Sequence, residues 1–164
     1  MLETGIRGFS VREVARRSGI PKSSIYRRWP TRAELLAAVL VRLESPSNTP
    51  DTGSMRGDLV EDIRREIHSL QNSMQALPRV ALEAREDPEL APVVRDVIES
   101  RRRARYPILE RAVDRGEISR DVDFDTAIDL LLGSLFARLI AQRPISESDA
   151  DEIVDCALQG IATT

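Results

Sequence analysis

The chain has 164 residues, of which 41% are hydrophobic and 31% are charged, and its formal net charge at pH 7 is −3. This length and composition allow one compact unit, or a small head on a larger body, and exclude a low-complexity chain that could not bury a core. The charge is uneven, because residues 1–44 hold nine Lys and Arg against four Glu, whereas residues 45–164 hold 15 Arg against 23 Asp and Glu.

Neither a membrane span nor a secretory signal is predicted. The longest apolar block, residues 130–140, is interrupted by Ser134 and Arg138 and is shorter than the roughly 20 residues that cross a bilayer. Residues 1–20 contain charged side chains throughout and no apolar core of a signal peptide. Cys156 is the single cysteine, so no internal disulfide is expected, and a cytoplasmic location is favoured.

Helix signals recur along the chain, with Pro and Gly at the breaks, and they predict an all-α fold. Ser10 and Glu13 form a Ser-x-x-Glu capping box, which opens a helix that stops at Gly19. Pro21 opens a second helix, because proline suits the first helical turn, and Pro30 prevents that helix from continuing. The sequence therefore predicts two short helices joined by a tight turn.

The second of these helices is short and basic. At 100° per residue, Ile25 and Trp29 lie together on one face. The opposite arc and its edges carry Lys22, Ser23, Ser24, Tyr26, Arg27 and Arg28. An apolar anchor behind exposed donors is typical of a helix-turn-helix, which places its second helix in the DNA major groove. The alternative is a solvated helix that happens to be basic.

A third helix begins at Thr31-Arg32-Ala33-Glu34, which repeats the capping-box pattern. The stretch FSVREVARRSGIPKSSIYRRWPTRAELLAAV, residues 9–39, resembles the DNA-binding domain of the TetR family of transcriptional regulators. Within it, residues 25–32 match the family pattern of a hydrophobic residue, Tyr, two variable residues, an aromatic residue, a variable residue, Ser or Thr, and a basic residue. The resemblance implies an N-terminal helix-turn-helix head and a C-terminal helical bundle that binds an effector and dimerises.

The resemblance also implies which side chains contact a double-stranded DNA operator. Those that bind phosphates or hold the DNA backbone would be Lys22, Tyr26 and Arg32. Those nearest to base edges would be Ser23, Ser24, Arg27 and Arg28. Two residues at the start of the preceding helix, Ser10 and Arg12, match positions that also reach DNA.

The chain departs from the family pattern at its start. Members begin with a full amphipathic helix before the Gly-Phe turn, whereas only residues 1–4 precede Gly5 here. We therefore predict a helix-turn-helix domain over 1–44 whose first helix is truncated, a flexible Pro-, Gly- and Ser-rich connection over 45–57, and an effector-binding and dimerisation domain over 58–164. The alternative function is a helical dimeric module that binds ligands or proteins and whose truncated head no longer binds DNA.

Five further helices are predicted in the body from apolar stripes and caps. The first runs from about Asp58 to Leu77, and a short one follows over 79–86. A long helix extends from residues 87–89 to Gly116, with a kink at Pro107. The last two begin at Asp123 and Ser146.

The basic run Arg101, Arg102, Arg103 and Arg105 favours a solvated face paired with glutamates, over a site for an acidic effector or DNA.

The helix that begins at Asp123 is apolar around nearly its whole circumference. Such a helix needs cover on every side, which one neighbouring stripe does not supply. The alternatives are a deeply buried helix in a monomer and a helix at a subunit interface. By the resemblance, the last two helices form a four-helix bundle with those of a second subunit, and a two-fold dimer presents two recognition helices about 34 Å apart.

The resemblance further implies an unknown small-molecule effector that enters between the body helices. Candidates for its pocket, each of which is equally explained as ordinary core, are Ile67, Leu70, Met74, Val94, Ile98, Phe136 and Leu139. No metal site, cofactor or enzymatic activity is predicted, because the chain has one His, one Cys and no phosphate-binding glycine loop. The function that fits best is a repressor released from a palindromic operator, with activation as a rival that no residue distinguishes.

Overall fold

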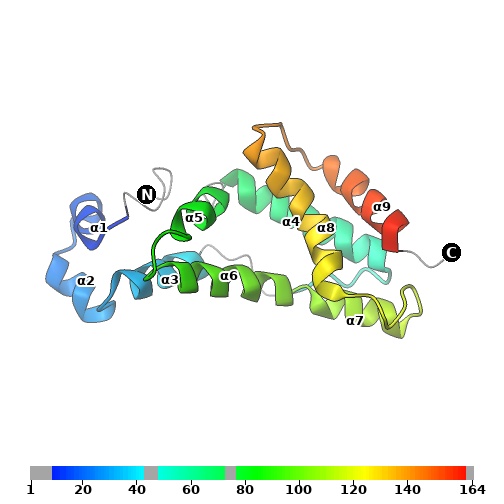
Figure 1. Ribbon diagram of the computed structural model, residues 1–164, viewed down its shortest axis with the longest axis horizontal. Helices are drawn as coiled ribbons and strands as arrows, with labels where there is room; N and C mark the ends of the chain where they lie inside the picture. Colours follow the sequence, from blue (N-terminus) through cyan, green and yellow to red (C-terminus); the bar gives the residue numbers. More distant parts are fainter. Residues whose placement is uncertain (1–8, 43–47, 73–76, 162–164) are drawn as a thin grey trace. The chain divides into compact units, whose positions relative to one another are not determined.

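A computed structural model describes residues 9–42, 48–72 and 77–161. Every element of secondary structure in these ranges is an α-helix (Figure 1), which confirms the predicted all-α fold. Among these helices, none combines the length and the apolarity that a membrane span requires.

Packing divides the chain into two compact units. One comprises Met1–Glu44 together with Ser73–Glu99, and the other comprises Ser45–Asn72 together with Ser100–Thr164. The segment 73–99 thus packs with the head residues, although it lies far from them in the sequence. The predicted domains 1–44 and 58–164 stay a prediction.

The first unit begins with three helices whose ends follow the predicted caps. They are α1 (Val11–Ser18), α2 (Lys22–Arg28) and α3 (Arg32–Arg42). The Ser10 hydroxyl accepts a hydrogen bond from the Glu13 N–H at 3.2 Å. Gly19 ends α1 with a φ of 70°, a left-handed conformation that glycine adopts without strain. These local signals fix the turn between α1 and α2.

The anchor of α2 differs in part from the prediction. Ile25 is 2% exposed and belongs to the core of the unit, together with Phe9, Leu36 and Leu40. Trp29 lies just beyond the last residue of α2 and is half-buried. The guanidinium of Arg28 stacks over its ring at 5.1 Å from the centroid. Ile25 is therefore the buried anchor of α2, and Trp29 lies at the edge of the core.

The second unit is built around α4 (Met55–Asn72). Figure 1 shows α8 (Phe124–Ile140) and α9 (Asp149–Ile161) beside α4, and α7 (Tyr106–Asp114) also packs on it. Its fully buried side chains include Leu59, Ile63, Ile67, Leu109 and Leu135. The predicted stripe on the first body helix is thus confirmed from Leu59 to Leu70.

Two predicted helix boundaries in the body are wrong. Leu77 does not end α4 but begins α5 (Leu77–Ala84). The long helix over 87–116 is two helices, α6 (Ala91–Arg103) and α7. Pro107 explains the break, because proline lacks the N–H that would continue the helical ladder and is instead accommodated in the first turn of α7.

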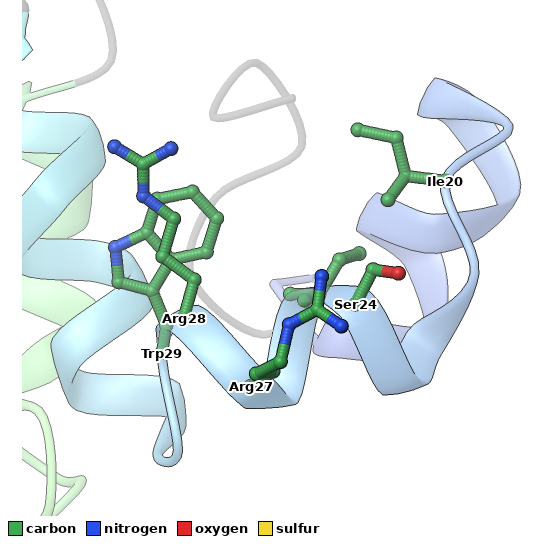
Figure 2. Close-up of a pocket in the computed structure, with 6 residues that line it drawn as sticks. Ile20, Ser24, Arg27, Arg28 and Trp29 are labelled. Atoms are coloured by element: carbon green, nitrogen blue, oxygen red, sulfur yellow. The ribbon is translucent and has the colours of Figure 1, made fainter.

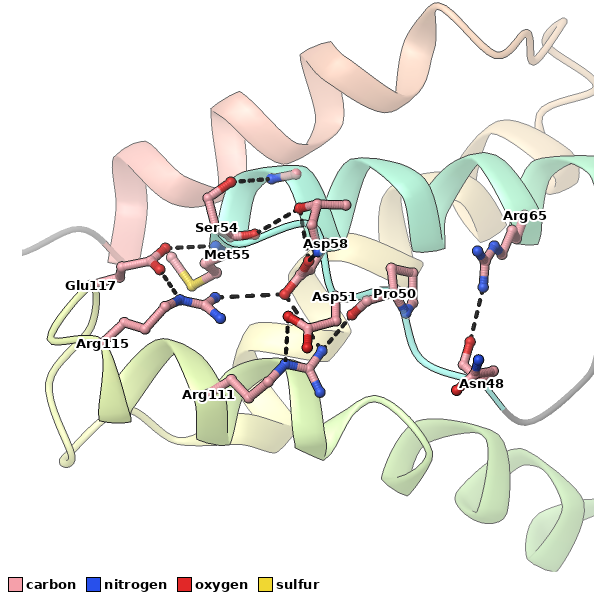
Figure 3. Close-up of polar contacts among 12 residues, drawn as sticks. Asn48, Pro50, Asp51, Ser54, Met55, Asp58, Arg65, Arg111, Arg115 and Glu117 are labelled. Atoms are coloured by element: carbon pink, nitrogen blue, oxygen red, sulfur yellow. Dashed lines mark hydrogen bonds and ion pairs between the residues drawn. The ribbon is translucent and has the colours of Figure 1, made fainter.

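The predicted flexible connection over 45–57 also needs correction in its described part. Helix α4 begins inside it, at Met55. The preceding residues contact the body, because Thr52 donates to the buried Asp58 carboxylate through its N–H at 2.5 Å and its hydroxyl at 2.8 Å. Arg111 and Arg115 also reach this carboxylate, at 3.4 and 3.5 Å (Figure 3). Burial opposes ionisation, but these donors lower the pKa of Asp58 below its usual value.

Candidate nucleic-acid interface

The exposed face of α2 is polar and cationic. Lys22, Ser23, Arg27 and Arg28 are exposed, and Tyr26 retains 50% of its accessible surface. These five side chains face solvent, whereas Ile25 on the opposite side of the helix packs into the core. Because α2 is only seven residues long, one buried side chain fixes which residues face solvent.

Ser24 lies at the edge of this face and lines an open hollow of about 480 Å³. Figure 2 shows Ser24 and Arg27 on α2, Ile20 on the preceding turn, and Arg28 stacked against Trp29. The lining combines apolar surface with two guanidinium groups and one hydroxyl. Such a surface offers donors for phosphates or base edges and apolar contact beside them.

The α1 helix contributes two of the predicted residues. Arg12 is exposed in the first turn. Ser10 caps the helix, so its oxygen already accepts the Glu13 N–H, while its hydroxyl hydrogen is left to donate. Further along α1, hydrogen bonds from Arg16 and Arg17 lower the pKa of Glu13 to about 2. These two arginines are thus paired with a carboxylate, whereas no ion pair involves Arg12, Lys22 or Arg27 within the described residues.

Arg32 lies in a different setting from the other predicted contacts. It is half-buried at the start of α3, and its Nη1 lies 2.9 Å from Oδ2 of Asp87. Sequence reasoning did not find this partner, because 55 positions separate the two residues. The acidic turn between α5 and α6 and the basic start of α3 are the signals that point to it.

The predicted effector residues fall in both units. Ile67 and Leu70 on α4 are buried, and Phe136 and Leu139 on α8 are half-buried in the same unit. The remaining described candidates, Val94 and Ile98 on α6, belong to the other unit. Met74 lies outside the described residues. Within the described ranges, no cluster of His, Cys, Asp or Glu is arranged to hold a metal ion.

The basic run at the end of α6 and in the turn after it is solvated only in part, because Arg103 is exposed whereas Arg105 is buried. Arg105 is 7% exposed, and its Nε and Nη2 lie 2.7 Å from Asp62 and Glu66 of α4. Arg101 donates to both carboxylate oxygens of Glu66, at 3.0 and 2.8 Å. Asp62 and Glu66 are four residues apart on α4, which puts both on one face of that helix. Arg101 and Arg105 have the same spacing, although Arg105 lies in the turn after α6, and the two matching spacings are the signal that points to this contact.

Two family models together match most of the chain. The model described as bacterial regulatory proteins of the tetR family matches residues 1–39, and the tetracyclin repressor-like C-terminal domain matches residues 49–157. An uncharacterized HTH-type transcriptional regulator of Mycobacterium tuberculosis is 36% identical over 159 residues, which cover 93% of this chain and 77% of that protein.

Similarity extends to a named repressor and to a solved structure. The DNA-binding transcriptional repressor TetR of Mycobacteroides abscessus is 29% identical over 96% of this chain and 85% of its own length. A crystal structure of a TetR family transcription regulator matches with a TM-score of 0.76 at 28% identity, over 95% of this chain and 88% of that one. The two domain matches, these relatives and the exposed basic α2 agree, and the chain belongs to the TetR family of bacterial transcriptional regulators.

Proposed function

We propose that this regulator is a repressor that binds a two-fold-symmetric operator through α2 and leaves it when a small-molecule effector binds. The observation that carries the proposal is the exposed face of α2 opposite the buried Ile25. A short helix fixed in this way can enter the major groove with all its polar side chains turned to the DNA. The relative named as a DNA-binding transcriptional repressor supports the sign of regulation.

The proposed division of labour follows the chemistry of the side chains. Tyr26 and Arg32 would bind phosphates, and Lys22 would hold the DNA backbone. Phosphate contacts made by a phenol or a cation do not depend on the base sequence. Arg27 and Arg28 would read base edges, because the guanidinium fork fits O6 and N7 of guanine. The smaller donors at the same surface are Ser10, Arg12, Ser23 and Ser24.

Dimerisation through α8 and α9 would give the operator its symmetry. Leu130 and Ile140 on α8 are 51% and 66% exposed in the single chain. Large apolar side chains on an exposed helix face are typical of a surface that a second copy covers. The effector would act by binding preferentially to the dimer geometry that does not fit DNA, because a ligand shifts an equilibrium only by its differential affinity. Binding to genomic DNA would place the protein in the cytoplasm.

The test is selection of bound fragments from a random DNA pool, followed by titration of the enriched site. We expect one two-fold-symmetric site, with affinity that falls steeply with salt. The variant with Tyr26→Ala and Arg27→Ala should lose binding at least tenfold, whereas Arg120→Ala, which removes an exposed arginine of the body, should retain it. Recovery of no preferred site, or equal binding by both variants, would favour a helical module that does not bind DNA.

A further inference from the structure

The first turn of α3 is held by two carboxylates from the turn between α5 and α6. The guanidinium of Arg32 pairs with Asp87 at 2.9 Å. The N–H of Ala33 donates to Oε1 of Glu89 at 3.3 Å. All four residues belong to one compact unit, so the contact is internal to it.

Both groups at the start of α3 are ones that an anion would use. The Ala33 N–H is one of the first-turn donors that have no partner within the helix, and Arg32 adds a full positive charge beside it. The neighbouring donor is already satisfied, because the Glu34 N–H bonds to the Thr31 hydroxyl at 3.1 Å. A DNA phosphate that binds Arg32 would therefore meet the carboxylates of Asp87 and Glu89 at the same place.

The Asp87 carboxylate also holds the start of α6. Its Oδ1 accepts the N–H groups of Glu89 at 3.1 Å and Leu90 at 3.2 Å, while Oδ2 contacts Arg32. One carboxylate thus bridges α3 and the turn that leads into α6. Any movement of that turn changes the distance between the negative charge and Arg32.

We propose that Asp87 and Glu89 form an internal competitor of the DNA phosphate, an acidic turn that occupies the anion-binding start of α3 and lowers operator affinity. The inference rests on the proposed function, because it takes Arg32 as a phosphate contact. A phosphate gains less binding free energy from an arginine that is already paired with a carboxylate, and the nearby negative charges repel it. The turn sets the affinity of the head through charge alone.

The test uses substitutions that remove charge and keep the hydrogen-bond acceptors. Asp87→Asn retains an oxygen for the Glu89 and Leu90 N–H groups, and Glu89→Gln retains one for Ala33. We expect each variant to bind the selected operator roughly threefold more tightly per half-site, hence about tenfold for a dimer, at low salt. The slope of log affinity against log salt should steepen by about one per half-site.

Two controls separate the proposal from a structural effect and from failure of the proposed function. Asp96→Asn removes an exposed acid of α6 in the same unit and should leave affinity within about twofold, as expected for a remote surface charge. Arg32→Ala should weaken binding and abolish the gain from Asp87→Asn. Unchanged or weaker binding by Asp87→Asn, in a wild-type background that binds DNA, would overturn the competitor and leave the proposed function standing. A wild-type chain that selects no operator would overturn both.

Discussion

Arg105→Met should destabilise the body strongly at neutral pH. The guanidinium makes contacts of 2.7 Å with Asp62, with Glu66 and with the carbonyl of Arg101. Glu66 keeps Arg101 as a partner after the substitution, whereas Arg105 provides the one ion pair of Asp62 among the described residues. The variant therefore leaves one uncompensated carboxylate at a buried site.

The free energy of protonating Asp62 sets an upper limit on what the unpaired charge can cost the folded state. Leaving a buried charge without its partner costs about 3–5 kcal/mol. Protonating a carboxyl whose unfolded pKa is about 3.9 costs about 1.4 kcal/mol per pH unit, hence about 4 kcal/mol at pH 7 and about 1.5 kcal/mol at pH 5. The lost hydrogen bond to Arg101 adds about 1 kcal/mol. We expect the free energy of unfolding to fall by about 5 kcal/mol at pH 7 and by about half as much at pH 5.

The direction of the pH effect follows from the pKa of Asp62. Burial already raises this pKa in the wild type, against the attraction of Arg105, and removal of Arg105 raises it further. A group whose folded-state pKa is raised stabilises the protein below its unfolded pKa, and this contribution is lost as the pH rises through the folded-state pKa. Urea denaturation of wild type and variant at pH 5 and pH 7 measures the difference.

The double variant Asp62→Asn with Arg105→Met is the matched control. It removes the uncompensated charge, so its stability at pH 7 should be closer to wild type than that of Arg105→Met, and its deficit should not change between pH 5 and pH 7. A deficit of Arg105→Met that is below about 1 kcal/mol, or that is equal at both pH values, would refute the reasoning.

Two further predictions concern the head and the proposed dimer. Ile25→Ala removes the buried anchor of α2 and should cost about 2–4 kcal/mol of local stability. Amide hydrogen exchange should then become faster in residues 9–42, while the body retains its protection. Unchanged exchange in the head would contradict this. Leu130→Glu places a charge on the exposed apolar surface of α8 and should shift the sedimentation equilibrium towards monomer. Leu82→Glu, at a similarly exposed leucine of α5, should not. Equal assembly of both variants would argue against an interface at α8.

The head could be predicted from the sequence because its signals are local. The capping box, Gly19 and the two prolines each act within a few residues, and the structure ends α1 and α2 where they predict. The burial of Ile25 follows from helical periodicity alone. The burial of Trp29 is predicted less well, because this residue follows the last residue of α2, where helical periodicity no longer applies.

The body could be predicted less well because several of its features depend on distant residues. Whether Pro107 bends one helix or separates two depends on how the segments before and after it pack. The stripe of apolar residues in the sequence is the same in either case. The sequence predicts that the basic run before Pro107 is solvated, because sequence spacing gives the charges but not their burial. Arg105 is buried only because α4 supplies Asp62 and Glu66 opposite it.

The distribution of ion pairs explains how a chain of net charge −3 can bind an anionic polymer. Many arginines of the body face carboxylates, as Arg56 does with Asp155 at 2.7 Å and Arg138 with Asp149 at 2.7 Å. Such paired charges have short-ranged fields that salt screens within about 10 Å. Lys22 and Arg27 on α2 have no such partners in the described structure, so the positive potential is concentrated on the surface proposed to meet DNA. Net charge therefore governs solubility, whereas the pairing of individual side chains decides where a phosphate is attracted.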